Sequence, residues 1–258
     1  MLRHVEHAMG TVFSFAVRGA TADDRPALSP ALAELHRLDA LFSTYRPESE
    51  ISRLRRGELT PAACDPLVTE ALAQCATIGA QTGGWFSAEY AARAGDTGLD
   101  PTGWVKGWAV ERASRLLTAA GYPHHSITGG GDVQTSGEAA PGRPWRIGIA
   151  DPARPGHLVG VLAGRDLAVA TSGTAERGAH ILDPHTGRPA LELLSLTLVG
   201  RGLARTDACA TAAFAMGPLR AMRWTQSQPD LEALAILPDG RRLGTAGFGR
   251  HLLPTGAA

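Results

Sequence analysis

Ser126-Ile127-Thr128-Gly129-Gly130-Gly131-Asp132-Val133 stands where the character of this sequence changes from helical to strand-like. Before it, apolar residues repeat at helical spacing over residues 26–45, 66–82 and 105–120. After it, short runs of strand-forming residues follow one another. The three glycines, which come directly after the first of these runs, predict a tight turn or a place where a ligand approaches the backbone.

The remaining strand signals lie on both sides of this stretch. Residues 12–18 alternate apolar and polar side chains, as a half-buried strand does. Residues 232–237 are turned back by Pro238-Asp239-Gly240, which indicates a hairpin. Grouped helices and grouped strands, without strict alternation, favour an α+β fold. The other expected strands are residues 126–128, 145–150, 158–162, 167–170, 180–182 and 194–199.

Length and charge limit what kind of protein this chain can be. Its 258 residues are 44% hydrophobic, which is enough to bury a core, and no linker marks a firm domain boundary. We therefore expect one domain over residues 1–258, with a loose tail from about residue 249 to 258. Lys+Arg and Asp+Glu both number 25, so the net charge is zero, which argues against a nucleic-acid binder.

The cysteines and the apolar segments indicate the compartment. Cys64, Cys75 and Cys209 form no close pair, so the sequence predicts neither a disulfide framework nor a zinc site. Residues 1–7 lack the apolar region of a signal peptide. No apolar stretch approaches the roughly 18 residues that a membrane span requires. We expect a soluble, cytoplasmic protein that does not insert into a membrane by itself.

A carboxylate and a hydroxyl lie four residues apart in Thr206-Asp207-Ala208-Cys209-Ala210-Thr211, at the start of a predicted helix over residues 207–216. Residues at that spacing share one helix face. Two hard oxygens beside a positive helix N-terminus suit a magnesium ion that carries a diphosphate. An Asp near a helix start is also a common capping residue, so this segment alone leaves both interpretations open.

Two further segments combine glycine with polar side chains. Leu99-Asp100-Pro101-Thr102-Gly103-Trp104-Val105-Lys106 predicts a glycine-bearing loop and a lysine in the first helical turn, a place that favours an anion nearby. Alternatively, this is a surface loop with a solvated lysine. Ala170-Thr171-Ser172-Gly173 offers hydroxyls and open backbone before His180, which is either a catalytic base or a structural hydrogen-bonding residue.

Taken together, these segments resemble the ApbE family, the FAD:protein FMN transferases. The resemblance implies an ApbE-like, T-fold-related α+β architecture of mixed or antiparallel sheets packed with helices. The matching residues follow the family's order from about residue 9 to 217. They are Met9-Gly10-Thr11, Lys106-Gly107, Gly130-Gly131-Asp132, Thr171-Ser172-Gly173, His180-Ile181-Leu182-Asp183-Pro184 with Thr186-Gly187, and Asp207 with Thr211.

The resemblance also implies an activity. Family members bind FAD and Mg²⁺, transfer FMN to a Ser or Thr hydroxyl in a flavinylation motif of an acceptor protein, and release AMP. Asp207, Thr211 and the carbonyl of Gly103 match the metal ligands, and His180 matches the general base. The matches to the flavin-nucleotide site are Met9, Tyr45, Asp100, Lys106 and Ile181, with Thr171, Ser172 and Gly173 against it and Trp85, Phe86 and Ser87 on the flavin side.

The sequence departs from the family pattern in two places within the chain. Ser87 stands where the family usually has a carboxylate, and the stretch from there to Asp100 is short. Ala210 replaces a second Asp that some members carry. Two other functions therefore stay open beside transfer. One is hydrolysis of FAD to FMN and AMP, with water in place of the acceptor, and the other is non-catalytic binding of FAD.

Overall fold

The fold is built on a twisted antiparallel sheet. A computed structural model of the protein describes residues 1–89, 97–175 and 178–254. In these residues, eight strands form one sheet in the order β1-β2-β3-β4-β7-β8-β9-β10, and two form a separate hairpin, β5-β6. The strands are β1 (Leu2–Ala8), β2 (Thr11–Val17), β3 (His125–Gly129), β4 (Asp132–Ser136), β5 (Trp145–Ala150), β6 (Leu158–Gly164), β7 (Ala168–Gly173), β8 (Ser195–Gly200), β9 (Glu232–Ile236) and β10 (Arg242–Gly244).

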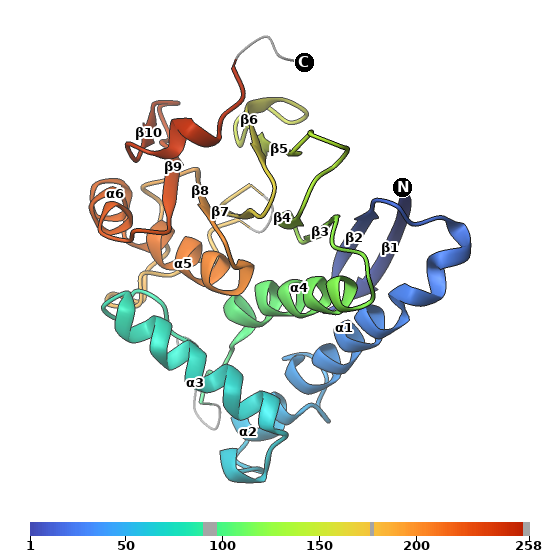
Figure 1. The fold of residues 1–258 in the computed structure, drawn as a ribbon. Helices are drawn as coiled ribbons and strands as arrows, with labels where there is room; N and C mark the ends of the chain where they lie inside the picture. Colours follow the sequence, from blue (N-terminus) through green and yellow to red (C-terminus); the bar gives the residue numbers. More distant parts are fainter. Residues whose placement is uncertain (90–96, 176–177, 255–258) are drawn as a thin grey trace.

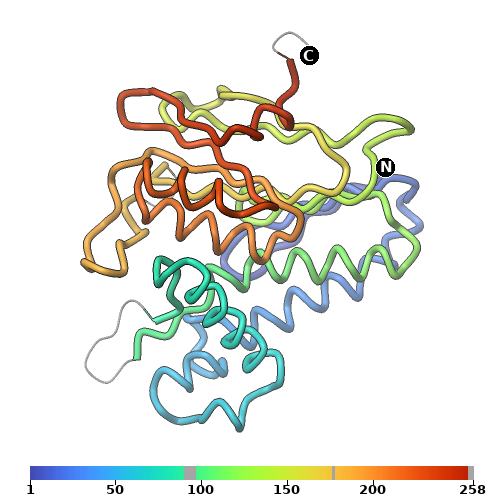
Figure 2. Tube along the Cα trace, turned by 60° about the vertical axis from the view of Figure 1, so that its left-hand side comes forward, coloured from blue at the N-terminus to red at the C-terminus, as the bar shows by residue number. Residues whose placement is uncertain are grey.

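The α-helices lie on one side of this sheet, whereas the short helix η3 (Phe248–His251) contributes Phe248 to the core on the other side. The remaining helices are η1 (Ala22–Leu28), α1 (Ser29–Phe42), α2 (Glu50–Arg55), η2 (Pro61–Ala63), α3 (Pro66–Gln81), α4 (Thr102–Ala119), α5 (Leu203–Ala215) and α6 (Pro218–Gln226). Helix α4 packs on β3 and β4, and α5 packs on β7 and β8 (Figure 1). Helix α3 contacts both α4 and α5 on the side away from the sheet (Figure 2).

The sheet separates two apolar cores, and β7 contributes side chains to both of them. Ala168 and Ala170 point to the helices and belong to the main core. Val169, between them, points the other way and pairs with Val133 and Val199 on the neighbouring strands. This alternation is the period of two that an extended strand imposes. The second core, which the β5-β6 hairpin contributes to, comprises Val133, Ile147, Ile149, Leu162, Val169, Val199 and Phe248.

Two tight turns lie side by side at one end of the sheet. Met9 and Gly10 join β1 to β2, and Gly130 and Gly131 join β3 to β4. All four have positive φ, of 53°, 66°, 57° and 91°, as a two-residue hairpin turn with that backbone twist requires. The amide of Gly130 donates to the carbonyl of Val12 at 3.3 Å, which holds the turns together. The turn predicted from the glycines is confirmed.

The structure confirms the α+β class and corrects several element boundaries. Residues 26–45 form η1 and then α1, because Pro26 and Pro30 each lack the N–H that a continuous helix needs. Helix α4 begins at Thr102, three residues before the predicted start, because Asp100 Oδ1 accepts the Thr102 N–H at 3.0 Å. Strand β1 and the helices α2 and α6 were not predicted.

Helix α5 begins at Leu203 and not at Asp207. Its first N–H groups are satisfied from elsewhere in the fold. The amide of Leu203 donates to Gln134 Oε1 at 3.0 Å, and that of Ala204 donates to Glu111 Oε2 at 3.2 Å. Side chains of β4 and α4 therefore cap this helix, and no local sequence signal marks its start.

Two other predictions about local structure were wrong. Residues 180–182 do not form a strand, since only an isolated bridge joins Leu182 to Pro189. The expected loose tail is ordered in its first part, because η3 extends to His251 and Leu252 bridges to Leu162. Residues 255–258 of that tail lie outside the described residues. Among the helices that the structure describes, none has the length and apolar character needed to cross a bilayer.

Candidate active site

Helices α4 and α5 approach each other very closely at Gly107. A Cβ atom on this glycine would lie 2.6 Å from the carbonyl oxygen of Leu203 and 3.0 Å from Cβ of Asp207. Any side chain at position 107 would push the two helices apart. The glycine therefore brings Lys106 on α4 within reach of Asp207 on α5.

Lys106 lies between two buried carboxylates. Its Nζ is 2.9 Å from Asp207 Oδ2 and pairs directly with Asp132 Oδ2 at the start of β4. The side chains of Asp132 and Asp207 are only 5% and 8% exposed. The lysine stem passes Gly130, where a Cβ would lie 3.3 Å from Lys106 Cδ, so the glycine turn leaves room for it. With both carboxyls ionised, one ammonium and two carboxylates would give this group a net charge of −1.

Burial and ion pairing shift the pKa values of this group in opposite directions. Burial alone would lower the pKa of Lys106, but the charges of Asp207 and Asp132 outweigh it, so the pKa is raised and the lysine stays protonated. Burial raises the pKa of Asp207, which Lys106 opposes and the like charge of Asp132 reinforces. The pKa of Asp207 is raised to about 7, so keeping both carboxyls ionised is costly in the protein alone, and a bound cation would favour the charged form.

Asp132 also holds the end of β7. Its Oδ1 accepts the N–H of Thr171 at 2.9 Å. On the other side of that strand, Thr171 Oγ1 lies 2.9 Å from Thr197 Oγ1 on β8. The segment Thr171–Ser172–Gly173 was predicted to lie against a nucleotide. Its first residue, Thr171, is thus joined through Asp132 to the group that contains Lys106 and Asp207.

The residues present fit a hard divalent cation. Asp207 Oδ2 is buried, and the Lys106 ammonium lies 2.9 Å from it. Thr211 follows one turn later on the same face of α5. No group of three His, Cys, Asp or Glu in the described parts of the chain could hold a metal. A cation here would therefore need hydroxyl and carbonyl oxygens beside the carboxylate, and Thr211 and Gly103 can supply them.

The structure corrects the expectation that helix N-termini create this site. Asp207 is the fifth residue of α5, and Lys106 is the fifth residue of α4, so neither lies in a first helical turn. The helix dipole is felt mainly within the first turn. Burial has the largest effect on the pKa of the Asp207 carboxyl, followed by the charges of Lys106 and Asp132.

His180 lies outside this buried group, in the chain that follows β7. Its side chain is exposed, and its Nδ1 lies 3.1 Å from the carbonyl oxygen of Gly178. A carbonyl can only accept, so this bond places the proton on Nδ1 and leaves the Nε2 lone pair free to take a proton. The next residue, Ile181, is buried in the main core and its carbonyl accepts the N–H of Ala190 at 3.0 Å. The core thus anchors the segment that presents His180.

The other predicted nucleotide-binding residues differ in their surroundings. Tyr45 is 92% exposed. Met9 occupies the left-handed turn beside Gly130, and it alone among the described non-glycine residues has positive φ. Asp100 caps the first turn of α4, and Ser172 is buried.

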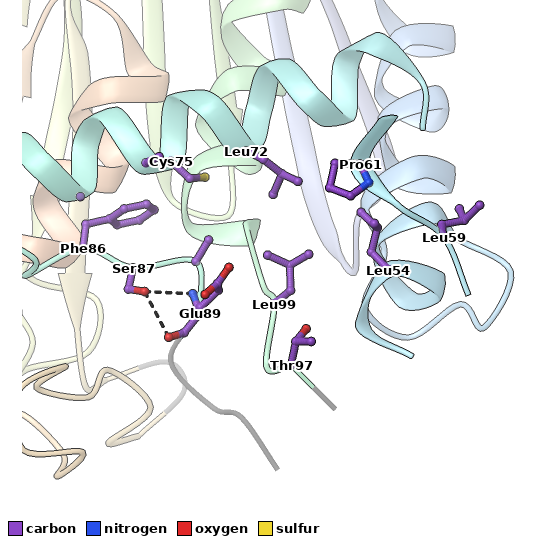
Figure 3. Close-up of a pocket in the computed structure, with 13 residues that line it drawn as sticks. Leu54, Leu59, Pro61, Leu72, Cys75, Phe86, Ser87, Glu89, Thr97 and Leu99 are labelled. Atoms are coloured by element: carbon purple, nitrogen blue, oxygen red, sulfur yellow. Dashed lines mark hydrogen bonds between the residues drawn. The ribbon is translucent and has the colours of Figure 1, made fainter. Parts of the chain in front are cut away.

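A cavity of about 470 Å³ lies beneath α3, beside the start of α4. Phe86 and Ser87 line it, together with Leu72 and Cys75 of α3 and Leu99 on the opposite wall (Figure 3). The ring of Phe86 also closes on Gly103, where a Cβ would lie 3.2 Å from it. Phe86 therefore connects the cavity with the helix that carries Lys106.

Trp85 does not line this cavity. Its ring meets His185 edge-on, with centroids 4.5 Å apart, and the Arg220 guanidinium lies 4.7 Å from its centroid. This cluster joins the end of α3, the turn after Ile181 and α6. His185 and Arg220 were not predicted as part of this cluster, because nothing in the sequence signals a contact between such distant segments.

The fold and this site define a protein with a buried lysine–carboxylate group at one end of an antiparallel sheet. The family model described as the ApbE family matches residues 9–93 and 88–235. This chain therefore belongs to the ApbE family.

Curated relatives and solved structures agree with this assignment. The chain is 37% identical over 122 residues to the FAD:protein FMN transferase of Rhodobacter capsulatus, and 32% identical over 128 residues to that of Vibrio cholerae. These alignments cover 44% and 46% of this chain, but only 23% and 38% of the relatives' own length.

The fold matches known structures over nearly its whole length. The flavin transferase ApbE from Vibrio cholerae superposes with a TM-score of 0.85 over 97% of this chain and 99% of that one, at 22% identity. The ApbE protein from Thermotoga maritima gives a TM-score of 0.83 over 98% and 99% of the two chains, at 20% identity. These likenesses confirm the ApbE-like fold.

Proposed function

We propose that this protein is an Mg²⁺-dependent FAD:protein FMN transferase. The observation that carries the proposal is the buried Asp207 carboxylate with the Lys106 ammonium 2.9 Å away, in a chain of the ApbE family. An oxygen placed in this way suits a hard cation, and an ammonium beside it suits a phosphate. Both are needed to bind and polarise a diphosphate.

Each side chain has a part in this proposal. Asp207, Thr211 and the carbonyl of Gly103 would hold the cation, which would neutralise charge on the diphosphate and on the leaving AMP. Lys106 would bind a phosphate oxygen of FAD. Thr171, Ser172 and Gly173, at the end of β7, would border the nucleotide. No enzyme nucleophile is required.

His180 is the proposed base that takes the proton of the acceptor hydroxyl. The hydroxyl oxygen of an acceptor Ser or Thr attacks the phosphorus of the FMN half, and the bond from that phosphorus to the AMP oxygen breaks. The hydroxyl proton moves to Nε2 of His180, the nitrogen that the Gly178 contact leaves unprotonated. AMP leaves with the electrons of the broken bond, and FMN stays on the acceptor as a phosphoester.

The cavity beside α4 is the proposed place for the flavin ring. Its volume lies in the range of about 300–1,000 Å³ that small-molecule sites occupy, and its walls are mainly apolar. Ser87 offers a hydroxyl there, in place of the carboxylate that the family usually has. The three cysteines are free, which fits a reducing compartment, and we propose that the protein acts in the cytoplasm.

The test is to incubate the protein with FAD, Mg²⁺ and a candidate acceptor, and then to separate the acceptor under denaturing conditions. We expect flavin fluorescence and an FMN mass increment on the acceptor, with one AMP released per FMN attached. EDTA should abolish both products. FMN that accumulates free at the same rate with and without acceptor would instead identify a hydrolase, and intact FAD would identify a flavin-binding protein.

Asp207→Asn tests whether this carboxylate holds the cation. The amide keeps the size of the side chain but removes the charge that a divalent ion needs. We expect this variant to lose Mg²⁺-dependent AMP release by at least about 100-fold, in line with the loss of a metal ligand. Full activity in the variant would show that the cation is held elsewhere.

A further inference from the structure

We propose that Asp132 is a positioning residue for the diphosphate site, which anchors Lys106 with one carboxylate oxygen and the backbone of β7 with the other. The inference rests on the proposed function, because it assigns the part that Asp132 plays at that same site. Neither composition nor local spacing indicated this part.

The first contact fixes the ammonium. Lys106 faces two carboxylates, Asp132 and Asp207, and a salt bridge to each of them is present. If Asp132 lost its charge, the ammonium would pair with Asp207 alone. It would then lie against the oxygen proposed for the cation and away from the diphosphate. Asp132 therefore keeps the Lys106 ammonium close to the diphosphate and away from the Asp207 oxygen that is proposed to hold the cation.

The second contact completes the sheet where strand pairing runs out. Strand β4 pairs with β7 only through Val133–Val169 and Gln134–Ala168. Continuing that register would place Thr171 opposite Gly131, but Gly131 belongs to the turn and β4 has no strand residue there. Asp132 Oδ1 takes the place of the missing acceptor and receives the Thr171 N–H at 2.9 Å. The side chain thus extends the sheet by one hydrogen bond.

Burial makes both contacts strong. Asp132 is 3% exposed, so water does not compete for either oxygen. A buried carboxylate that accepts a backbone N–H and a lysine N–H is fixed in its rotamer. Through it, α4 and the end of β7 are held in one relative position, and these elements carry Lys106 and Thr171.

The charge of Asp132 allows a test in which positioning and simple electrostatics predict opposite signs. In Asp132→Asn, the amide oxygen can still accept from Thr171, but the negative charge facing Lys106 is gone. Removing a negative charge near an anion site strengthens anion binding if charge alone matters. Losing the anchor of Lys106 weakens it. The dissociation constant of FAD, measured by quenching of flavin fluorescence first in EDTA and then in Mg²⁺, shows whether the loss of charge or the loss of the Lys106 anchor has the larger effect.

We expect Asp132→Asn to weaken FAD binding by about 10-fold, as the loss of an orienting partner does. In a Lys106→Met background, the same change should have no effect or should tighten binding, because the anchored group is absent. The control is Glu34→Gln, which weakens the 2.6 Å pair with Arg112 farther along α4, and which should leave FAD affinity unchanged.

The contact with Thr171 has its own readout. Asp132→Ala removes both interactions, whereas Asp132→Asn keeps the acceptor. We expect the melting temperature of the Ala variant to lie about 2–4 °C below that of the Asn variant. Equal or tighter FAD binding in Asp132→Asn, with normal binding in the unmodified protein, would overturn the inference alone. Absence of FAD binding in the unmodified protein would overturn the proposed function as well.

Discussion

Single charged residues here depend on partners that lie far away in the sequence. Lys106 is paired with Asp132 and Asp207, which follow it by 26 and 101 positions. Each of the three charges would be costly to bury alone, since an unpaired buried ion costs several kcal/mol, roughly 3–5. Changing one partner therefore affects the other two, and variants of this group are best compared with one another.

His180 gives a prediction about the chemical step. Its Nε2 is available as a base, so His180→Ala should slow FMN transfer by about 10²- to 10⁴-fold. FAD affinity should change little, because the histidine is exposed and apart from the buried lysine–carboxylate group. The initial rate of AMP release at saturating FAD and acceptor measures this effect. A change of less than about threefold would remove His180 from the role of base.

His125 gives a prediction about pH. It is fully buried, its Nδ1 lies 2.7 Å from the carbonyl of Tyr122, and its Nε2 lies 2.7 Å from Ser114 Oγ. The carbonyl fixes the proton on Nδ1, so Nε2 accepts from the serine. Burial lowers the pKa of His125 in the folded protein below its unfolded value of about 6.5. As the pH falls below 6.5, the unfolded state therefore takes up the proton first, and the folded state loses stability.

The measurement is urea unfolding between pH 7.5 and 5.5, with His125→Asn as the comparison. Asn can still donate to Tyr122 but does not titrate. Below pH 6.5, the free energy of unfolding of the unmodified protein should fall faster than that of the variant, by up to about 1.4 kcal/mol per pH unit. Parallel curves for the two proteins would show that His125 does not set this dependence.

Among the secondary-structure elements, the crossing of α4 and α5 depends most on one residue. Gly107→Ala places a methyl group 2.6 Å from the Leu203 carbonyl, on backbone that cannot move without shifting α5. We expect a loss of about 1–3 kcal/mol in the free energy of unfolding, as overpacking causes. FAD binding should weaken as well, because Lys106 and Asp207 separate.

The matched control for that variant is Gly249→Ala. This glycine lies in η3 without a positive φ, and a methyl group on it would meet no described atom within 4 Å, so the change should be nearly neutral. Urea unfolding of both variants compares the two positions directly. A Gly107→Ala protein as stable as the control would mean that the two helices do not cross as closely as the structure shows.

Local pattern predicted those elements whose signals are local. The apolar periodicity of α3, the alternation of β2 and the glycine turn between β3 and β4 all appear where they were expected. The start of α5 was missed because Gln134 and Glu111, from β4 and α4, satisfy its first N–H groups. A cap supplied by tertiary contacts leaves no signal in the neighbouring sequence.

The same limit applies to the candidate site. The spacing of Asp207 and Thr211 indicated a cation, and Lys106 indicated an anion, from local chemistry alone. The importance of Gly107 and the two contacts of Asp132 depend on which helices cross and on where β4 stops. Those are properties of the tertiary structure, and a single sequence gives no measure of them.

The whole molecule places its proposed functional residues at one end of a sheet with a core on each face. The α-helices cover one face and the β5-β6 hairpin contributes to the core on the other, while the two hairpin turns, the end of β7 and the start of α4 meet at the same end (Figure 1). The lysine–carboxylate group therefore lies where elements from distant parts of the chain meet.

A crystal soaked with FAD and Mn²⁺, a cation that scatters anomalously in place of Mg²⁺, tests this account most directly. We predict an anomalous peak about 2.1 Å from a carboxylate oxygen of Asp207, in contact with the diphosphate, with the Lys106 ammonium on a phosphate oxygen. Flavin dinucleotide bound elsewhere, or bound here with no cation at Asp207, would contradict it.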